Sequence, residues 1–298
     1  MRVLILGKNG MLGRDMEAVF HDQDFVALGQ NDLDVTNRDK VFEQFMTVQP
    51  DVVINCTGYT NVDQAEDEEE KANEINGYAV GVLAQACREV DATLVHFSTD
   101  YVFRGDKKKG YGEEDGTDPI NAYGRSKSLG EKLLVEEMEL MDELSPLEGK
   151  YFLIRTSWLY GHHGKNFVDT MLELARSRKE LKVVDDQHGR PTFTMDLCEQ
   201  IKWLLLSREY PAGIYHITNS GTTSWFKFAS KIFELAKKDI DVIACTSEEF
   251  PRPAHRPKYA ALLNNKLPAL RPWEDALRAY MGVPKSSSQR GQPGQQKS

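Results

Sequence analysis

Short apolar runs alternate with longer amphipathic segments along the first half of the chain. The apolar runs predict strands at Val3–Leu6, Phe25–Leu28, Val52–Asn55, Thr93–Phe97 and Phe152–Arg155. Apolar positions at helical spacing predict helices near Met11–Phe20, Arg38–Met46, Ala72–Glu89 and Tyr123–Met141. Such an order is typical of a parallel sheet covered on both faces. We therefore predict an α/β fold, a Rossmann-like doubly wound parallel sheet with ligands at the carboxyl ends of its strands.

The alternation is less regular after about Thr156. Apolar spacing there predicts further helices and strands at Phe167–Arg178, Leu181–Val184, Met195–Ser207, Gly213–Ile217 and Trp225–Lys237. Ser224 is the expected N-cap of the last helix, and Trp203 and Trp225 fall at apolar helical positions that predict core packing. We interpret residues 1–156 as an NAD(P)-binding Rossmann-like domain. Residues 157–283 are then a smaller C-terminal substrate-binding lobe, partly interleaved with the main sheet, and the polar residues 284–298 predict a disordered tail.

Composition narrows the class of protein. With 298 residues, 40% hydrophobic and 28% charged, the chain is an enzyme-sized globule. Its formal charge of −9 argues against nucleic acid or anionic membranes as partners, and no apolar run approaches the ~20 residues of a membrane-spanning helix. The four cysteines are scattered in apolar contexts without metal-ligand spacing. They predict buried free thiols in a reducing, cytoplasmic setting.

A glycine-rich turn follows the first predicted strand and opens the first helix. In Gly7-Lys8-Asn9-Gly10-Met11-Leu12-Gly13 the first glycine permits a tight turn. The second lets the backbone approach a pyrophosphate, and the third lets helix and strand pack closely. A tight turn alone can also require glycine, but the strand–turn–helix context favours dinucleotide binding at the helix N-terminus.

The choice between NADPH and NADH stays open. The segment Gly29–Val35 after the second strand has no arginine for a 2′-phosphate, and no acidic residue at the immediate strand end. Lys8 or a more distant basic group is left as a candidate for holding a phosphate.

Tyr123 and Lys127 lie four residues apart at the start of a predicted helix, which places both on one face. A phenol ordinarily has a pKa near ~10, and a neighbouring ammonium favours the phenolate, so Tyr123 can serve as an acid–base group. Ser98 and Thr99 lie past the fourth strand, where a hydroxyl can polarise a substrate carbonyl. Either hydroxyl alone would be assigned to turn formation; beside Tyr123 and Lys127 we favour catalysis.

These motifs resemble the extended, sugar-nucleotide branch of the short-chain dehydrogenase/reductase superfamily, and within it the dTDP-4-dehydrorhamnose reductase family. The resemblance covers the chain to about Gly282. It rests on Gly7–Gly13, Asp34–Asn37, Asn55–Asp63, Ser98–Gly105, Tyr123–Lys127, Arg155–Gly161, Asn166-Phe167, Asp186–Thr192 and Arg256–Lys258.

The resemblance implies roles for individual residues. It implies a catalytic triad of Thr99, Tyr123 and Lys127, in which Tyr123 protonates the C4 oxygen and Lys127 holds the nicotinamide ribose. Together with Tyr123 and Lys127, the implied cofactor-binding residues are Gly7, Asn9, Gly10, Met11, Leu12, Gly13, Asp34, Val35, Tyr59 and Thr60. The implied substrate-binding residues are Asp100, Tyr101, Trp158, Asn166, Arg190 and Arg256.

The function that follows is NAD(P)H-dependent reduction of dTDP-4-dehydro-L-rhamnose to dTDP-L-rhamnose, with a nucleotide-linked deoxysugar as substrate. Reduction or epimerisation of another 4-keto-6-deoxy nucleotide sugar is one alternative. A non-catalytic regulatory subunit resembling the methionine adenosyltransferase β subunit is another, which the retained Thr99, Tyr123 and Lys127 disfavour. Some relatives use a divalent ion at a subunit contact, but the sequence assigns no residue to it, so no metal site is predicted and a homodimer is left open.

Overall fold

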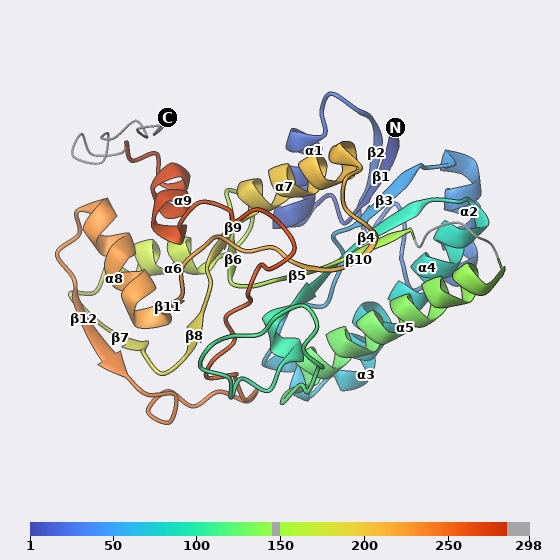
Figure 1. The fold of residues 1–298 in the computed structure, drawn as a ribbon. Helices are drawn as coiled ribbons and strands as arrows, with labels where there is room; N and C mark the ends of the chain where they lie inside the picture. Colours follow the sequence, from blue (N-terminus) through green and yellow to red (C-terminus); the bar gives the residue numbers. More distant parts are fainter. Residues whose placement is uncertain (145–149, 285–298) are drawn as a thin grey trace, which may run out of the picture.

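A six-stranded parallel sheet forms the centre of the molecule in the computed structural model, which describes residues 1–144 and 150–284 (Figure 1). The strand order is β10-β5-β4-β3-β1-β2. The bounds are β1 Arg2–Leu6, β2 Asp24–Leu28, β3 Val52–Asn55, β4 Thr93–Thr99, β5 Tyr151–Thr156 and β10 Gly213–His216. All five strands predicted in the first half are confirmed, and the doubly wound sheet with them.

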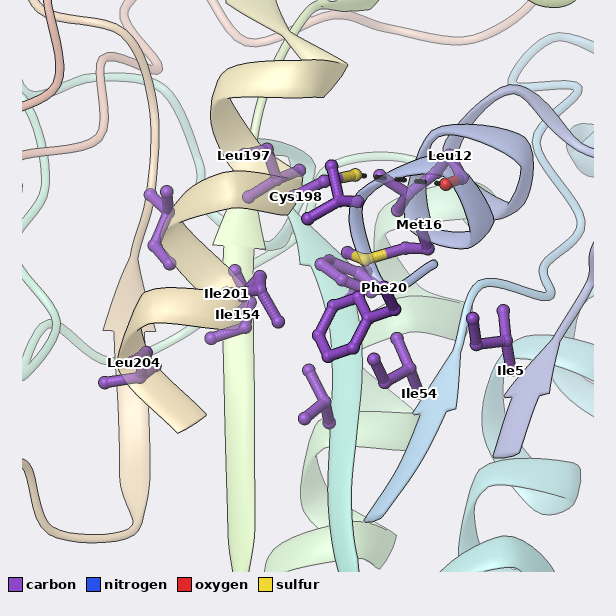
Figure 2. Packing of buried hydrophobic residues seen from close by; sticks show 14 of the residues in the cluster. Ile5, Leu12, Met16, Phe20, Ile54, Ile154, Leu197, Cys198, Ile201 and Leu204 are labelled. Carbon is purple, nitrogen blue, oxygen red and sulfur yellow. Dashed lines mark hydrogen bonds between the residues drawn. The ribbon is translucent and has the colours of Figure 1, made fainter. Parts of the chain in front are cut away.

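Helices cover both faces of this sheet because its strands are apolar on both sides. Along β1, Val3 and Ile5 face one buried cluster, while Leu4 and Leu6 face the other. On the first face, α1 (Met11–Val19) packs beside α7 (Thr194–Ser207). Figure 2 shows Leu12 of α1 and Cys198 of α7 side by side above the sheet. On the other face lie α2 (Arg38–Val48), α4 (Ala79–Glu89) and α5 (Ala122–Leu144).

The third predicted helix differs from the prediction. Instead of one α-helix over Ala72–Glu89, the chain forms α3 (Glu69–Asn73), a π-helical turn at Glu74–Tyr78 and then α4. Gly77 of this turn lies so close to α5 that a Cβ there would stand 2.6 Å from a methyl carbon of Leu129. The turn widens the helix where it touches α5, and such turns recur at functional sites.

The second half of the chain forms another buried cluster beside the sheet. Its helices are α6 (Phe167–Leu174), α8 (Trp225–Ala236) and α9 (Trp273–Tyr280). This half also contains three separate two-stranded pairs. The longest is the parallel pair of β7 (Glu180–Val184) and β12 (Asp241–Cys245). The two short ones are β6 (Leu159–Tyr160) with β9 (Thr192–Phe193), and β8 (His188–Gly189) with β11 (Thr223–Ser224). Yet β10 and α7, which also come from this half, lie in the layers of the main sheet. The division at residue 156 stays a prediction.

Several details of the second half were predicted wrongly or missed. Trp203, expected in the core, is 39% exposed on the outer side of α7, where it contacts Tyr210. The helix starting at Phe167 ends at Leu174, and the strand β12 and the helix α9 were not predicted. Ser224 does cap α8, accepting a hydrogen bond from the Lys227 N–H.

Two further findings bear on the sequence predictions. Within residues 1–144 and 150–284, none of the helices has the length and apolarity needed to cross a bilayer. Apart from Pro284, the tail predicted to be disordered lies outside the described residues.

Candidate active site

The glycine-rich turn joins β1 to α1 at the carboxyl edge of the sheet. Gly7 has φ +84°, a left-handed conformation that favours glycine, and its N–H donates to the Leu28 carbonyl at 2.8 Å. A Cβ on Gly13 would overlap the Gly7 carbonyl oxygen. Gly10 caps α1 without a side-chain hydrogen bond, so the first N–H groups of that helix are free to receive an anion.

A cavity of about 470 Å³ opens beside this turn. It brings together five residues predicted to bind the cofactor: Gly7, Asn9, Gly10, Asp34 and Val35. It is also lined by residues that the sequence analysis did not single out: Gln30, Leu33, Thr36, Cys56, Thr57, Gly58, Lys71, Glu74 and Ile75. For the first six the signal was their position after β2 and β3, at the edge where a parallel sheet binds ligands. Lys71, Glu74 and Ile75 come from α3 and the π-helical turn, where the sequence carried no such signal. Polar walls and a free helix N-terminus fit a dinucleotide.

The basic residue of the turn is already engaged. The Lys8 ammonium forms a 2.6 Å ion pair with Asp32, which lowers the pKa of that carboxyl. Cys56 is half-buried on the cavity wall, whereas Cys87, Cys198 and Cys245 are buried. All four are free thiols.

The predicted triad meets where β4 ends against the first turns of α5. Lys127 is 4% exposed, and its ammonium donates to the Phe97 carbonyl at 2.9 Å. Burial lowers the pKa of Lys127 to about 8. Burial likewise raises the pKa of Tyr123 to about 12, against the opposing effect of a hydrogen bond with Thr99. A neutral phenol, a hydroxyl and an ammonium therefore share one corner of the sheet.

Two polar networks hold α5 in register with the sheet, and the sequence analysis found neither. Glu131 of α5 forms a buried ion pair with Arg155 of β5 at 2.7 Å and accepts a hydrogen bond from Ser98. Ser98 thus points to α5, and only Thr99 reaches the phenol. Asn76 of the π-helical turn bonds the Ser126 hydroxyl and both backbone groups of Tyr59.

Tyr59 and Thr60 lie just past β3. Tyr59 packs with Tyr123 against the same buried alanines, and its hydroxyl donates to Glu68 at 3.0 Å. Thr60 is exposed. Met11 and Leu12 form the first turn of α1, with Leu12 packed into the core.

A second cavity, of about 690 Å³, is lined by a residue that packs against Tyr123. Of the predicted substrate-binding residues it brings together Tyr101, whose ring meets Tyr123 edge-on at 5.7 Å, and Arg256. The Arg256 guanidinium forms a bidentate ion pair with the Asp63 carboxylate, with hydrogen bonds of 2.9 and 3.0 Å. Unforeseen lining residues supply most of its charge: Arg178, Glu180, Lys182 and Arg252.

Four other predicted substrate-binding residues do not line this cavity. Trp158 has φ +49° and stacks at 3.6 Å on Trp225, which does line it. Asn166 caps α6, and its amide bonds the Gly161 carbonyl, Asp169 and Tyr280. Arg190 is half-buried with no hydrogen-bond partner for its Nε among the described residues. Asp100 is buried beside Thr99.

We expect Gly13→Ala to lower affinity for NADPH by at least about tenfold, because the added methyl group overlaps the Gly7 carbonyl and must push the turn aside. Titration of cofactor fluorescence measures this. Gly116→Ala is the matched control, since a Cβ at Gly116 meets nothing within 4 Å. Equal affinities of the two variants would contradict a pyrophosphate seat at this turn.

Comparison with known proteins adds independent information. Residues 1–283 match the family model described as RmlD substrate binding domain. A dTDP-4-dehydrorhamnose reductase of Streptomyces griseus is 40% identical over 287 residues, 93% of this chain and 91% of that protein. The spore coat polysaccharide biosynthesis protein SpsK of Bacillus subtilis is 38% identical, covering 94% of this chain and 96% of its own. The crystal structure of dTDP-4-dehydrorhamnose reductase from Bacillus anthracis in complex with NADP has a TM-score of 0.87 at 40% identity, covering 94% of this chain and 98% of that one.

Proposed function

The chain belongs to the RmlD substrate binding domain family, and from this premise we propose that it is an NAD(P)H-dependent dTDP-4-dehydrorhamnose reductase. The reaction is reduction of the C4 keto group of dTDP-4-dehydro-L-rhamnose to give dTDP-L-rhamnose. The relatives named for this activity and the NADP-bound relative support both the substrate and the cofactor class.

One geometric observation carries the proposal: the Thr99–Tyr123–Lys127 corner lies next to residues that line each of the two cavities. On one side, a Cβ at Gly58, a residue of the 470 Å³ cavity, would stand 3.4 Å from the Lys127 ammonium. On the other side, Tyr101 of the 690 Å³ cavity meets the Tyr123 ring. A cofactor in the first cavity and a sugar in the second would therefore meet at the phenol.

In the proposed mechanism, the reduced nicotinamide supplies a hydride to C4 when it is bound. The Tyr123 phenol donates its proton to the C4 oxygen, so the carbonyl becomes a hydroxyl and the phenol a phenolate. The buried Lys127 ammonium stabilises that phenolate electrostatically. The Thr99 hydroxyl hydrogen-bonds the carbonyl oxygen and polarises it.

The Tyr123 phenol has the protonation state that the proposed reduction needs at the outset. Burial raises the pKa of Tyr123 to about 12, so the phenol is protonated at neutral pH and has a proton to donate.

The charged residues around the second cavity support a nucleoside diphosphate as the part of the substrate that binds there. Arg178, Lys182 and Arg252 line it, and only Asp63 and Glu180 oppose them. Asp63 is neutralised by Arg256. The surplus of guanidinium and ammonium groups suits a diphosphate.

The cysteines bear on where the protein works in the cell. Free thiols at all four cysteines are compatible with a reducing cytoplasm, and we propose that location. The homodimer stays a prediction.

The test is turnover of dTDP-4-dehydro-L-rhamnose, made in situ by the upstream dehydratase and epimerase, with NADPH and NADH in separate reactions. We expect loss of nicotinamide absorbance and dTDP-L-rhamnose as the product in NMR. Cofactor binding without turnover of this or any other 4-keto-6-deoxy nucleotide sugar would contradict the proposal and favour a regulatory dinucleotide-binding subunit, which a pull-down with methionine adenosyltransferase would then examine.

A further inference from the structure

Asp100 is a carboxyl group buried at the end of β4, directly beside the proposed catalytic hydroxyl. It begins the 3₁₀ turn Asp100–Val102 and is 2% exposed. Its Oδ1 is 3.0 Å from the Thr99 Oγ1, and its Oδ2 has no hydrogen-bond partner among the described residues. No described lysine, arginine or histidine forms an ion pair with it.

This environment disfavours a carboxylate. A buried negative charge held by Thr99 and its own backbone N–H alone, without a cation, is costly, whereas a neutral carboxyl carries no charge to bury. Burial accordingly raises the pKa of Asp100 to about 7.

The protonation state of Asp100 decides where the Thr99 proton goes. A threonine hydroxyl has one proton and two lone pairs. One lone pair accepts the Tyr101 N–H at 3.2 Å. When Asp100 is ionised, the single Thr99 proton points to its carboxylate. When Asp100 is neutral, its O–H can donate to the second lone pair, and the Thr99 proton can turn toward the Tyr123 oxygen and the place of the substrate carbonyl.

We propose that Asp100 works as a protonated positioning residue, donating to Thr99 so that the Thr99 hydroxyl can donate to the carbonyl oxygen of the substrate. This inference rests on the proposed reductase function. No bond to carbon changes at Asp100, and its proton stays on the carboxyl through the reaction.

The charged and titratable neighbours agree with this assignment. Facing Asp100 are the phenols of Tyr101, on the same turn, and Tyr123, on α5. The Lys127 ammonium is held by the Phe97 carbonyl, and the Arg256 guanidinium near Tyr101 is held by Asp63. The charge of an ionised Asp100 contributes to the raised pKa of Tyr123 and makes the phenol a weaker acid.

The test is the pH dependence of single-turnover hydride transfer between about pH 6 and pH 9 in wild type and Asp100→Asn. As the pH rises, the wild-type rate should fall in two steps, the first from ionisation of Asp100 near pH 7 and the second from deprotonation of Lys127 near pH 8. The asparagine amide always donates and cannot ionise. This variant should therefore lose only the lower ionisation, while Asp100→Ala should be at least about tenfold slower than Asp100→Asn at low pH.

Asp15→Asn is the matched control. Asp15 is also 2% exposed and accepts a hydrogen bond from a threonine, Thr194, but it lies on α1 away from the triad. Both ionisations should remain in that variant. An unchanged two-step profile in Asp100→Asn would overturn the inference. If the Asp100→Asn protein fails to fold, Asp100→Ser keeps a hydrogen-bond donor without a charge and gives the same readout.

An infrared measurement separates this inference from the proposed function. Wild-type protein with NADP⁺ but no substrate should show a protonated-carboxyl band near pH 6 that disappears above about pH 8 and is missing from Asp100→Asn. If the wild-type and Asp100→Asn spectra match, Asp100 is ionised throughout and the inference fails, even in an active reductase. If the band is present but no keto sugar is reduced, it is the proposed function that fails.

Discussion

Replacing Tyr123 by phenylalanine is expected to lower kcat by about 10³-fold, while the affinity for NADPH changes little. The phenylalanine ring keeps the packing with the alanines beside Tyr59, but the proton for the C4 oxygen is lost. Single-turnover absorbance measures the chemical step, and fluorescence titration measures cofactor binding.

Tyr78→Phe is the control for this experiment. Tyr78 lies in the π-helical turn and is 60% exposed, so its hydroxyl should be dispensable for turnover. If Tyr123→Phe keeps more than about a tenth of the wild-type rate, Tyr123 is not the proton donor, since general acid catalysis contributes at least about 10².

Replacing Glu131 by alanine is expected to reduce the free energy of unfolding by about 3–5 kcal/mol. Arg155 is 3% exposed and lies 5.0 Å from the centre of the Phe103 ring. Without Glu131 its guanidinium stays in the interior, and the main-chain carbonyl of Glu113 is then the one hydrogen-bond acceptor left to it among residues 1–144 and 150–284. Urea denaturation followed by circular dichroism measures the loss.

Two further variants make this second prediction sharp. Glu136→Ala breaks an exposed pair with Lys132 on the same helix and should cost no more than about 0.5 kcal/mol. Glu131→Met combined with Arg155→Met removes both buried charges and should recover much of the stability lost in Glu131→Ala. Equal losses for Glu131→Ala and Glu136→Ala would mean that water reaches the Arg155 guanidinium.

The contacts of Glu131 also position the helix that carries Lys127. Glu131 lies one helical turn beyond Lys127 on α5, and its bonds to Ser98 and Arg155 fix that helix against β4 and β5. The catalytic corner therefore depends on a buried ion pair that does not itself touch the substrate.

The sequence predicted those features of the fold that depend on residues close together in the chain. The five strands of the first half and the cap at Ser224 were predicted because hydrophobic period and capping preference are properties of a few neighbouring residues. The glycine turn belongs with them, since glycine spacing reports backbone geometry directly. The family resemblance pointed to Asp34 and Val35, which line the 470 Å³ cavity.

Features that depend on distant partners were not predicted. A helical pattern could not reveal the π-helical turn, because the cause is the close approach of Gly77 to Leu129. It could not separate Trp203, which faces outward, from Trp225, which stacks on Trp158, because both occupy apolar helical positions.

The sequence by itself determined the sheet and the glycine turn and supplied the candidates for catalysis, because these follow from local period, local backbone geometry and residue type. Only the tertiary structure decided the environment of those residues. The pairing of Glu131 with Arg155, the burial of Lys127 and the isolation of Asp100 all depend on segments far apart in the chain. Desolvation and neighbouring charge set the protonation of a group, and both are properties of the packed molecule.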